Sequence, residues 1–301
     1  MTVQGNNVVD IAKWRESGVM EMDNLLFQQW TELLAKRTGI SLPESRRSFL
    51  ISSLNIRMHE LAIESYQAYF NYLLSGHEGN IEWETLVDRL TVHETRFYRD
   101  QQAIKLIRDV YLARLESKPE KKTSINIWSV ACATGEETYS LAIDLDDCLS
   151  NTGKEYYFSV TGSDISSAAI ATAREAIYKE NRLTNVPEHF LDHYFDKESD
   201  KSYKVKDFIR KRVCFNQLNL LGLKNARVGL MDVIFCQNVL IYFKREQRLQ
   251  ILNDLVSHLK PGGLLVLGAG EIHGWAHPDM ESVAYEGTLA FRRTEKQESE
   301  I

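Results

Sequence analysis

The sequence predicts an α/β protein in which a small all-helical N-terminal domain precedes a Rossmann-like domain with a mostly parallel sheet. Three observations support this fold class. A chain of 301 residues with 44% hydrophobic residues is long enough to bury two cores. Roughly the first hundred residues show only helical periodicity. Beyond them, apolar runs of strand length alternate with helical segments, which is typical of a doubly wound parallel sheet.

The helical domain is predicted over residues 1–117. Asp23 suits the N-cap of its first helix, and Gly39 suits the end of that helix. The apolar side chains between them fall on one face: Leu26, Trp30, Leu33 and Leu34. Further helices are predicted over residues 43–61, 63–76, 81–90 and 100–117. These apolar stripes are interpreted as core packing.

A proline and several charges mark residues 118–124 as a linker, and the second domain is predicted over 125–294. Its strands are expected at 125–131, 156–164, 232–243 and 262–270, and its helices at 135–149, 166–178 and 245–259. The alternation around Gly287 predicts a hairpin at the sheet edge, within 283–293. Residues 295–301 are interpreted as a tail.

Basic residues gather in a segment where the regular alternation lapses, residues 180–215. The cluster consists of Lys201, Lys204, Lys206, Arg210, Lys211 and Arg212. The segment is predicted to be a small basic β-subdomain inserted into the second domain. A simple solvated face is the alternative.

Composition excludes several classes of protein. The net charge of −6 and the pI near 5.8 argue against broad nucleic-acid binding. The sequence shows neither a signal peptide nor an apolar stretch of about 20 residues, so we expect no membrane insertion and a cytoplasmic location. Four widely spaced cysteines form no C-x-x-C pair, so we expect no metal site and four buried thiols: Cys132, Cys148, Cys214 and Cys236.

The turn after the first predicted strand reads ACATGEE, residues 131–137. A dinucleotide site needs G-x-G-x-x-G there, because glycines let the backbone approach a pyrophosphate. Here Glu136 and Glu137 would repel a phosphate but attract a cation. S-adenosylmethionine fits, since it carries a sulfonium and an ammonium and no phosphate. Alternatively, the two glutamates only cap the helix that follows.

Other polar residues follow the ends of later strands. Asp164 lies where an acid can accept hydrogen bonds from ribose hydroxyls, although it can also cap the next helix. Asn219 and Asn238 lie near later strand ends, where they can contact the adenine edge or the methionine backbone.

Several motifs, taken in order, resemble the CheR-type chemotaxis receptor methyltransferases: LTVHETRFYRD, VACATGEETYSLA, TGSDIS, QLNLL and FCQNVLIYF. The resemblance covers nearly the whole chain. It implies that the second domain is a class I S-adenosylmethionine-dependent methyltransferase domain with a β-subdomain insertion.

The resemblance also implies the roles of individual residues. Arg99 and Tyr242 are implied to be catalytic. The implied cofactor contacts are His93, Thr95, Arg99, Ala131, Gly135, Glu136, Glu137, Asp164, Asn219, Leu220, Gln237 and Asn238. Two positions depart from the family: His93 replaces an asparagine and Gln237 replaces an arginine. Both put the details of acceptor recognition in question.

The implied reaction is methyl transfer to glutamate carboxylates on the helical cytoplasmic domain of a chemoreceptor, with S-adenosylhomocysteine as the second product. Arg46, Arg47 and Arg57 are candidates for docking that domain, and the basic insertion resembles one that binds a C-terminal tethering peptide in some members. We expect a monomer. The alternatives are a same-fold methyltransferase with another substrate, a non-catalytic sensor that binds the cofactor, and an NAD-dependent oxidoreductase, which the missing glycines disfavour.

Overall fold

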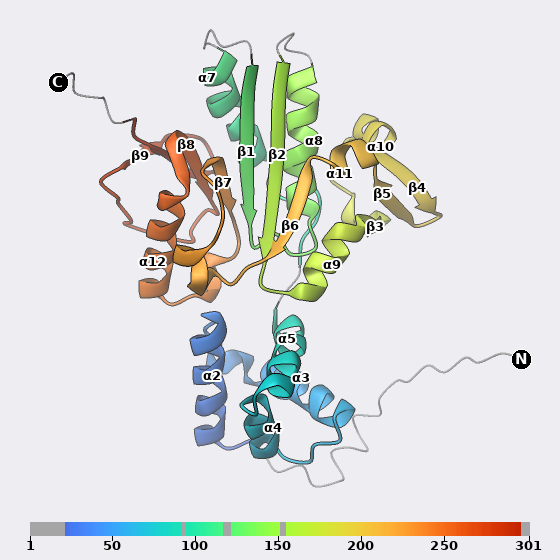
Figure 1. The fold of residues 1–301 in the computed structure, drawn as a ribbon, viewed down its shortest axis with the longest axis vertical. Coiled ribbons are helices and arrows are strands. Elements are labelled where there is room, and N and C mark those ends of the chain that lie inside the picture. The colour runs from blue at the N-terminus through green and yellow to red at the C-terminus, as the bar shows by residue number, and fades with distance from the viewer. Residues whose placement is uncertain (1–21, 92–93, 117–121, 151–154, 296–301) are drawn as a thin grey trace, which may run out of the picture. The chain divides into compact units, whose positions relative to one another are not determined.

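The computed structural model describes residues 22–91, 94–116, 122–150 and 155–295 (Figure 1). The chain divides into two compact units, one made of the helices up to Leu90 and one made of the chain from Thr91 onward together with the short segment Thr38–Ser41.

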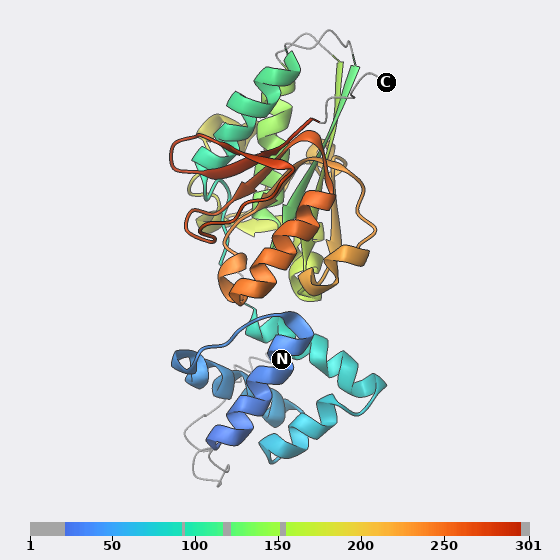
Figure 2. The ribbon, with the colours of Figure 1, turned by 90° about the vertical axis from the view of Figure 1, so that its left-hand side faces the viewer.

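The N-terminal unit is helical throughout its described elements (Figure 2). Its elements are α2 (Asn24–Thr38), η1 (Glu44–Arg46), α3 (Arg47–Glu60), α4 (Tyr66–Leu73) and α5 (His77–Leu90). The predicted boundaries of the first helix are confirmed: Asp23 Oδ1 accepts the Leu26 N–H at 2.7 Å, and Gly39 has a φ of +79°. The last helix of the unit begins earlier than predicted, at His77.

The core of this unit contains a buried carboxylate as well as apolar side chains. Trp30 is fully buried, and its ring contacts the rings of Tyr69 and Phe70 at 5.5 and 5.2 Å. Glu82, only 4% exposed, accepts the Tyr69 hydroxyl at 2.6 Å and Arg57 Nε at 2.8 Å. Burying a carboxyl group is costly unless it is paired and hydrogen-bonded, and these two side chains supply its partners.

Two of the arginines predicted to dock the receptor are used inside the N-terminal unit. Two nitrogens of the Arg57 guanidinium donate to the Glu82 carboxyl oxygens, and the Arg57 side chain is only 14% exposed. Arg47 donates to Asn24 Oδ1 at 2.7 Å and stacks on the Phe27 ring. These contacts do not test receptor docking, which stays a prediction for all three arginines, and Arg46 is exposed.

The second unit is built on a seven-stranded sheet with the order β6-β2-β1-β7-β8-β10-β9. Its strands are β1 (Lys122–Val130), β2 (Glu155–Asp164), β6 (Val213–Gln217), β7 (Met231–Cys236), β8 (Leu259–Leu267), β9 (Met280–Val283) and β10 (Leu289–Arg293). The first five are parallel neighbours, and β10 and β9 add an antiparallel hairpin at one edge. The doubly wound sheet and the edge hairpin are confirmed.

Both faces of the parallel sheet are covered, as a parallel sheet requires. Successive residues of β1, Ile127 and Trp128, point to opposite faces and belong to separate core clusters. The helices around them are α6 (Gln101–Leu106), η2 (Ile107–Leu112), α7 (Ala113–Glu116), α8 (Glu136–Ser150), α9 (Ser167–Glu175) and α12 (Arg245–Ser257). The α6, η2 and α8 side chains belong to the Ile127 cluster and those of α12 to the Trp128 cluster.

The basic segment contains a separate three-stranded antiparallel sheet with the order β3-β5-β4. Its elements are β3 (Ile177–Lys179), η3 (Glu180–Arg182), α10 (Glu188–Tyr194), β4 (Phe195–Ser199), β5 (Ser202–Val205) and α11 (Asp207–Arg210). Its bounds differ from the prediction at both ends. The preceding helix stops at Glu175, because Ala176 adopts a left-handed φ of 59°. Val213, Cys214 and Phe215, predicted to lie in the insertion, belong to β6 of the main sheet.

The cysteine prediction holds for only part of the set. Cys132 and Cys236 are buried, Cys148 is partly buried, and Cys214 is exposed because it lies on the edge strand β6. Within the described ranges, no group of three His, Cys, Asp or Glu side chains is arranged to hold a metal ion. None of the helices seen there has the length and apolar character needed to span a bilayer.

Candidate active site

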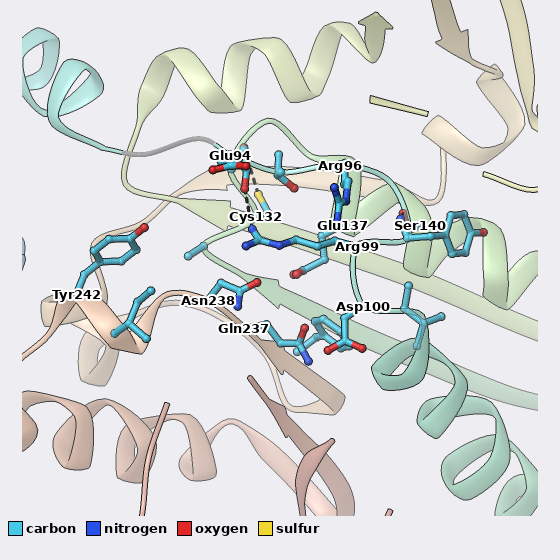
Figure 3. Close-up of a pocket in the computed structure, with 17 residues that line it drawn as sticks. Glu94, Arg96, Arg99, Asp100, Cys132, Glu137, Ser140, Gln237, Asn238 and Tyr242 are labelled. Carbon is cyan, nitrogen blue, oxygen red and sulfur yellow. Dashed lines mark hydrogen bonds between the residues drawn. The ribbon is translucent and has the colours of Figure 1, made fainter. Parts of the chain in front are cut away.

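A pocket opens at the carboxyl edge of the main sheet, where β1 and β7 end (Figure 3). Ligands of doubly wound proteins bind at this edge. The lining comes from the segment Glu94–Asp100, the turn after β1 and the turn after β7. Seven predicted site residues are among those that line it: Thr95, Arg99, Ala131, Glu137, Gln237, Asn238 and Tyr242.

Four lining residues hold a left-handed backbone without being glycine. They are Tyr98, Ala131, Ala133 and Asn238, with φ values of 51°, 57°, 48° and 58°. Such conformations cost about 1–3 kcal/mol each and cluster at functional sites. Of these four, Ala131 and Asn238 were among the predicted site residues, and Tyr98 and Ala133 were not.

Glu137 supplies a carboxyl group to this pocket. Its Oε1 accepts the Ser129 hydroxyl at 2.7 Å. Burial raises the pKa of Glu137 to about 8, the neighbouring Glu271 carboxyl adds to the rise, and Arg99 opposes it. A cation that binds beside a carboxyl group with a raised pKa lowers that pKa and so favours the ionised form.

Glu136 is not among the residues that line the pocket. It is only 1% exposed, accepts the Thr134 hydroxyl at 2.6 Å and lies 3.9 Å from Arg182 Nε. Burial raises the pKa of this carboxyl too. Of the two adjacent glutamates, Glu137 therefore lines the pocket, and Glu136 is buried outside its lining.

Gly135 is required by packing. A Cβ there would lie 2.7 Å from the Ala173 Cβ and 3.0 Å from the Tyr178 hydroxyl, and the residue has a φ of +94°. The glycine therefore lets the start of α8 approach α9.

Asp164 joins two turns of the sheet edge. Its Oδ2 accepts the Ala133 N–H and its Oδ1 accepts the Ser166 N–H, each at 2.9 Å. Asn219 Oδ1 accepts the Leu221 N–H at 3.0 Å, and Leu220 is buried. Asp164 is the last residue of β2, and Asn219 and Leu220 follow β6. None of the three is in the lining of the pocket.

The two residues implied to be catalytic both face the pocket. Arg99 is exposed, and its Nη1 donates to the Glu94 carbonyl at 2.7 Å. Figure 3 shows Arg99 extended across the site towards Glu94, with Tyr242 on the far side of Asn238. His93, the first predicted contact of this segment, lies outside the described residues.

A buried acid that the sequence interpretation missed holds the turn after β7. Glu271 is 2% exposed, and its two oxygens accept the N–H groups of Leu240 and Gly268, each at 2.9 Å. Gln237, which replaces the family's arginine, is buried against the Leu267 carbonyl at 3.5 Å. The signal for Glu271 was available, since it follows the predicted strand 262–270 directly.

The donor set of the pocket suits S-adenosylmethionine. Glu94, Asp100 and Glu137 line the pocket beside Arg96 and Arg99. The carboxyl groups favour a sulfonium and an ammonium, and the guanidinium groups favour a carboxylate. Gly135 is occupied by helix packing, so the turn after β1 lacks the glycine-lined approach that a dinucleotide needs.

Comparison with known proteins agrees with this chemistry. Residues 93–286 match the family described as "CheR methyltransferase, SAM binding domain", and residues 25–91 match "CheR methyltransferase, all-alpha domain".

Among curated proteins, the chain is 33% identical to "Chemotaxis protein methyltransferase 2" of Pseudomonas aeruginosa, over 81% of this chain and 85% of that protein. It is 31% identical to the "Chemotaxis protein methyltransferase" of Escherichia coli, over 81% and 83%. It is 30% identical to the protein of that name from Borreliella burgdorferi, over 77% and 83%. Fold, pocket and sequence together show that the chain belongs to the CheR methyltransferase family and carries that family's S-adenosylmethionine-binding domain.

Proposed function

We infer that this protein transfers a methyl group from S-adenosylmethionine to glutamate side-chain carboxylates of a chemoreceptor, forming methyl esters for sensory adaptation. One observation carries the proposal: Arg99 and Tyr242 line the same pocket as the Glu137 carboxyl, at the ligand-binding edge of the sheet.

The acceptor group needs no general base. A glutamate side chain has an ordinary pKa of about 4.3, so it is already anionic at neutral pH. When bound, S-adenosylmethionine supplies an electrophilic methyl group. The protein's contribution is to orient the reacting groups and to exclude water, which can lower a barrier by roughly 7–11 kcal/mol.

Arg99 is proposed to hold the acceptor carboxylate. Its planar guanidinium matches the two oxygens of a carboxylate. One nitrogen is engaged by the Glu94 carbonyl, which fixes the side chain across the pocket. Tyr242 is proposed to orient the methyl group or the acceptor with its hydroxyl.

The remaining predicted contacts are proposed to hold the cofactor. Glu137 would hold the ammonium group of the cofactor. Asp164 would accept the ribose hydroxyls, with Asn219 and Leu220 at the adenine and Gln237 and Asn238 at the methionine backbone. Thr95, Ala131 and Gly135 would shape the site, and Glu136 would support it from behind.

The receptor is the proposed partner, recognised by positive charge. The exposed Arg46 remains a candidate for contact with acidic receptor helices. The insertion around the small sheet β3-β5-β4 is a candidate for binding a C-terminal tethering peptide, because Lys204 lies on β5 and Lys201 and Lys206 flank that strand. We propose that the protein acts as a monomer.

The test is transfer of a radiolabelled methyl group from S-adenosylmethionine to membranes enriched in a chemoreceptor. We expect label that is released as methanol by mild base, the signature of a methyl ester, and no label on receptors whose acceptor glutamates are alanine. Binding of S-adenosylhomocysteine without any ester formation would contradict the proposal.

Replacement of Arg99 tests the assignment of the acceptor site. Arg99→Ala should reduce kcat by at least about 100-fold, because the carboxylate loses its orienting partner. The affinity for S-adenosylhomocysteine, measured by calorimetry, should change little. Weaker cofactor binding combined with a normal kcat at saturation would assign Arg99 to the cofactor instead.

A further inference from the structure

The segment that carries Arg99 is positioned by the small inserted sheet. Residues 94–100 form only turns and irregular backbone. Arg182, in η3 of the insertion, contacts this segment twice: its carbonyl accepts the Phe97 N–H at 3.1 Å, and its Nη1 donates to the Thr95 carbonyl. Arg182 therefore holds the backbone at Thr95 and at Phe97, two residues before Arg99.

Side chains of the insertion strengthen this attachment. The Phe97 ring is fully buried and meets the rings of Tyr178 on β3 and Phe195 on β4 edge to face, at 4.9 and 5.2 Å. Asn185 Nδ2 donates to the Tyr98 carbonyl at 3.3 Å. The ring contacts hold the Phe97 side chain in the core, and the hydrogen bonds hold the backbone of the segment in place.

The same region of the insertion also reaches the turn after β1. Arg182 Nε lies 3.9 Å from the Glu136 carboxylate, and the Tyr178 hydroxyl donates to the Thr134 carbonyl at 2.8 Å. Arg182 therefore lies between two parts of the site, the Thr95 backbone and the first turn of α8. It is not itself among the residues that line the pocket.

We propose that Arg182 is a positioning residue for methyl transfer, which acts through the Thr95–Arg99 backbone and ties it to the acidic first turn of α8. The inserted sheet is then part of the catalytic framework, in addition to any part it plays in binding a receptor. Only the kinetic tests of this proposal depend on the function proposed above.

The kinetic test compares Arg182→Ala with a matched variant. Arg174→Ala removes another guanidinium of the same unit that donates to a backbone carbonyl, that of Phe215 at 2.6 Å. We expect Arg182→Ala to lower kcat by about 100-fold, because small displacements of a catalytic group are costly. KM for the receptor should change little, and Arg182→Lys should recover part of kcat. An equal loss of kcat in the Arg174 variant would overturn the proposal.

A double-mutant cycle separates positioning from loss of stability. If Arg182 acts through Arg99, Arg182→Ala should cause little further loss of kcat in an Arg99→Ala background. Full additivity of the two losses would show that Arg182 acts elsewhere and would overturn the proposal.

Hydrogen exchange tests the attachment without any reaction. In the cofactor-free protein, the amides of residues 94–100 should exchange faster in Arg182→Ala than in the wild type or in Arg174→Ala. Unchanged exchange would contradict the proposal even if the enzyme is active. If the wild type transfers no methyl group but this exchange still increases, the proposed function fails and the structural role of Arg182 stands.

Discussion

Two adjacent glutamates do different work at the start of one helix. Neighbouring residues of an α-helix point about 100° apart, so Glu136 and Glu137 cannot share one environment. Glu137 faces the pocket, whereas Glu136 faces Thr134 and Arg182. The sequence showed that this turn is acidic, but a single side chain carries that acidity into the pocket.

The raised pKa of Glu137 predicts proton release when a cationic ligand binds. In the cofactor-free protein the pKa is about 8, so the carboxyl is largely protonated at neutral pH. An ammonium group beside it lowers this pKa, and the proton leaves. The affinity for S-adenosylhomocysteine should therefore rise with pH until about pH 8 and then level off. Calorimetry in buffers with different ionisation enthalpies measures the proton count.

Glu137→Gln is the control for that measurement. The amide has a similar shape but cannot ionise, so the variant should bind the ligand more weakly and release no proton through this site. Proton release that persists in Glu137→Gln would assign the titration to another group.

At the scale of elements, the close approach of α8 to α9 depends on Gly135. Gly135→Ala places a Cβ 2.7 Å from the Ala173 Cβ, at a φ of +94°. Gly287→Ala is the matched variant, since it has a φ of +73° but no atom within 4 Å of the new Cβ. Both carry a backbone penalty of about 1 kcal/mol, and Gly135→Ala should lose roughly 1–3 kcal/mol more through overpacking.

Chemical denaturation of the two variants checks this difference. Gly135→Ala should also weaken S-adenosylhomocysteine binding, because the shifted turn carries Ala131 and Glu137. Equal stability losses in the two variants would show that α8 and α9 separate without cost.

The elements that the sequence predicted well are those with strong periodic patterns. The apolar runs that became β1, β7 and β8 were recognised as strands, but the prediction 232–243 ran past the end of β7 at Cys236, and β8 begins at Leu259, before the predicted 262. The short elements of the insertion could not, because β3 follows a helix with no glycine or proline between them, and Ala176 makes the break. β6 was misassigned because its few apolar residues follow a basic run and only pairing with β2 defines it.

The site was predictable to a similar extent. Residues that follow strand ends, such as Glu137 and Asn238, line the pocket, and their roles there stay predictions. Arg182 was not found, since it acts on backbone C=O and N–H groups that carry no sequence signal. Glu271 was missed although it directly follows the predicted strand 262–270.

At the scale of the whole molecule, the two units have separate cores. Among the described residues, the N-terminal cluster around Trp30 and Leu54 contains none from the sheet domain, and the sheet domain has its own two clusters. We therefore expect two calorimetric unfolding transitions. S-adenosylhomocysteine should raise only the transition of the sheet domain, because only the folded form of that unit binds it.

Leu54→Ala provides the complementary change. Leu54 is fully buried, so its truncation should lower the unfolding free energy of the N-terminal unit by about 2–5 kcal/mol. Only the transition temperature of that unit should fall. A single transition that shifts in both experiments would show that the units unfold together.

Asp164 braces the crossovers that follow β1 and β2, through its bonds to Ala133 and Ser166. Any substitution of this acid therefore removes architecture as well as a ligand contact, and even asparagine can preserve only one of the two acceptors. The loss of cofactor affinity in an Asp164 variant will therefore exceed the free energy of the ribose contact alone. The two contributions can be separated by measuring the same loss for a ligand that lacks the ribose hydroxyls.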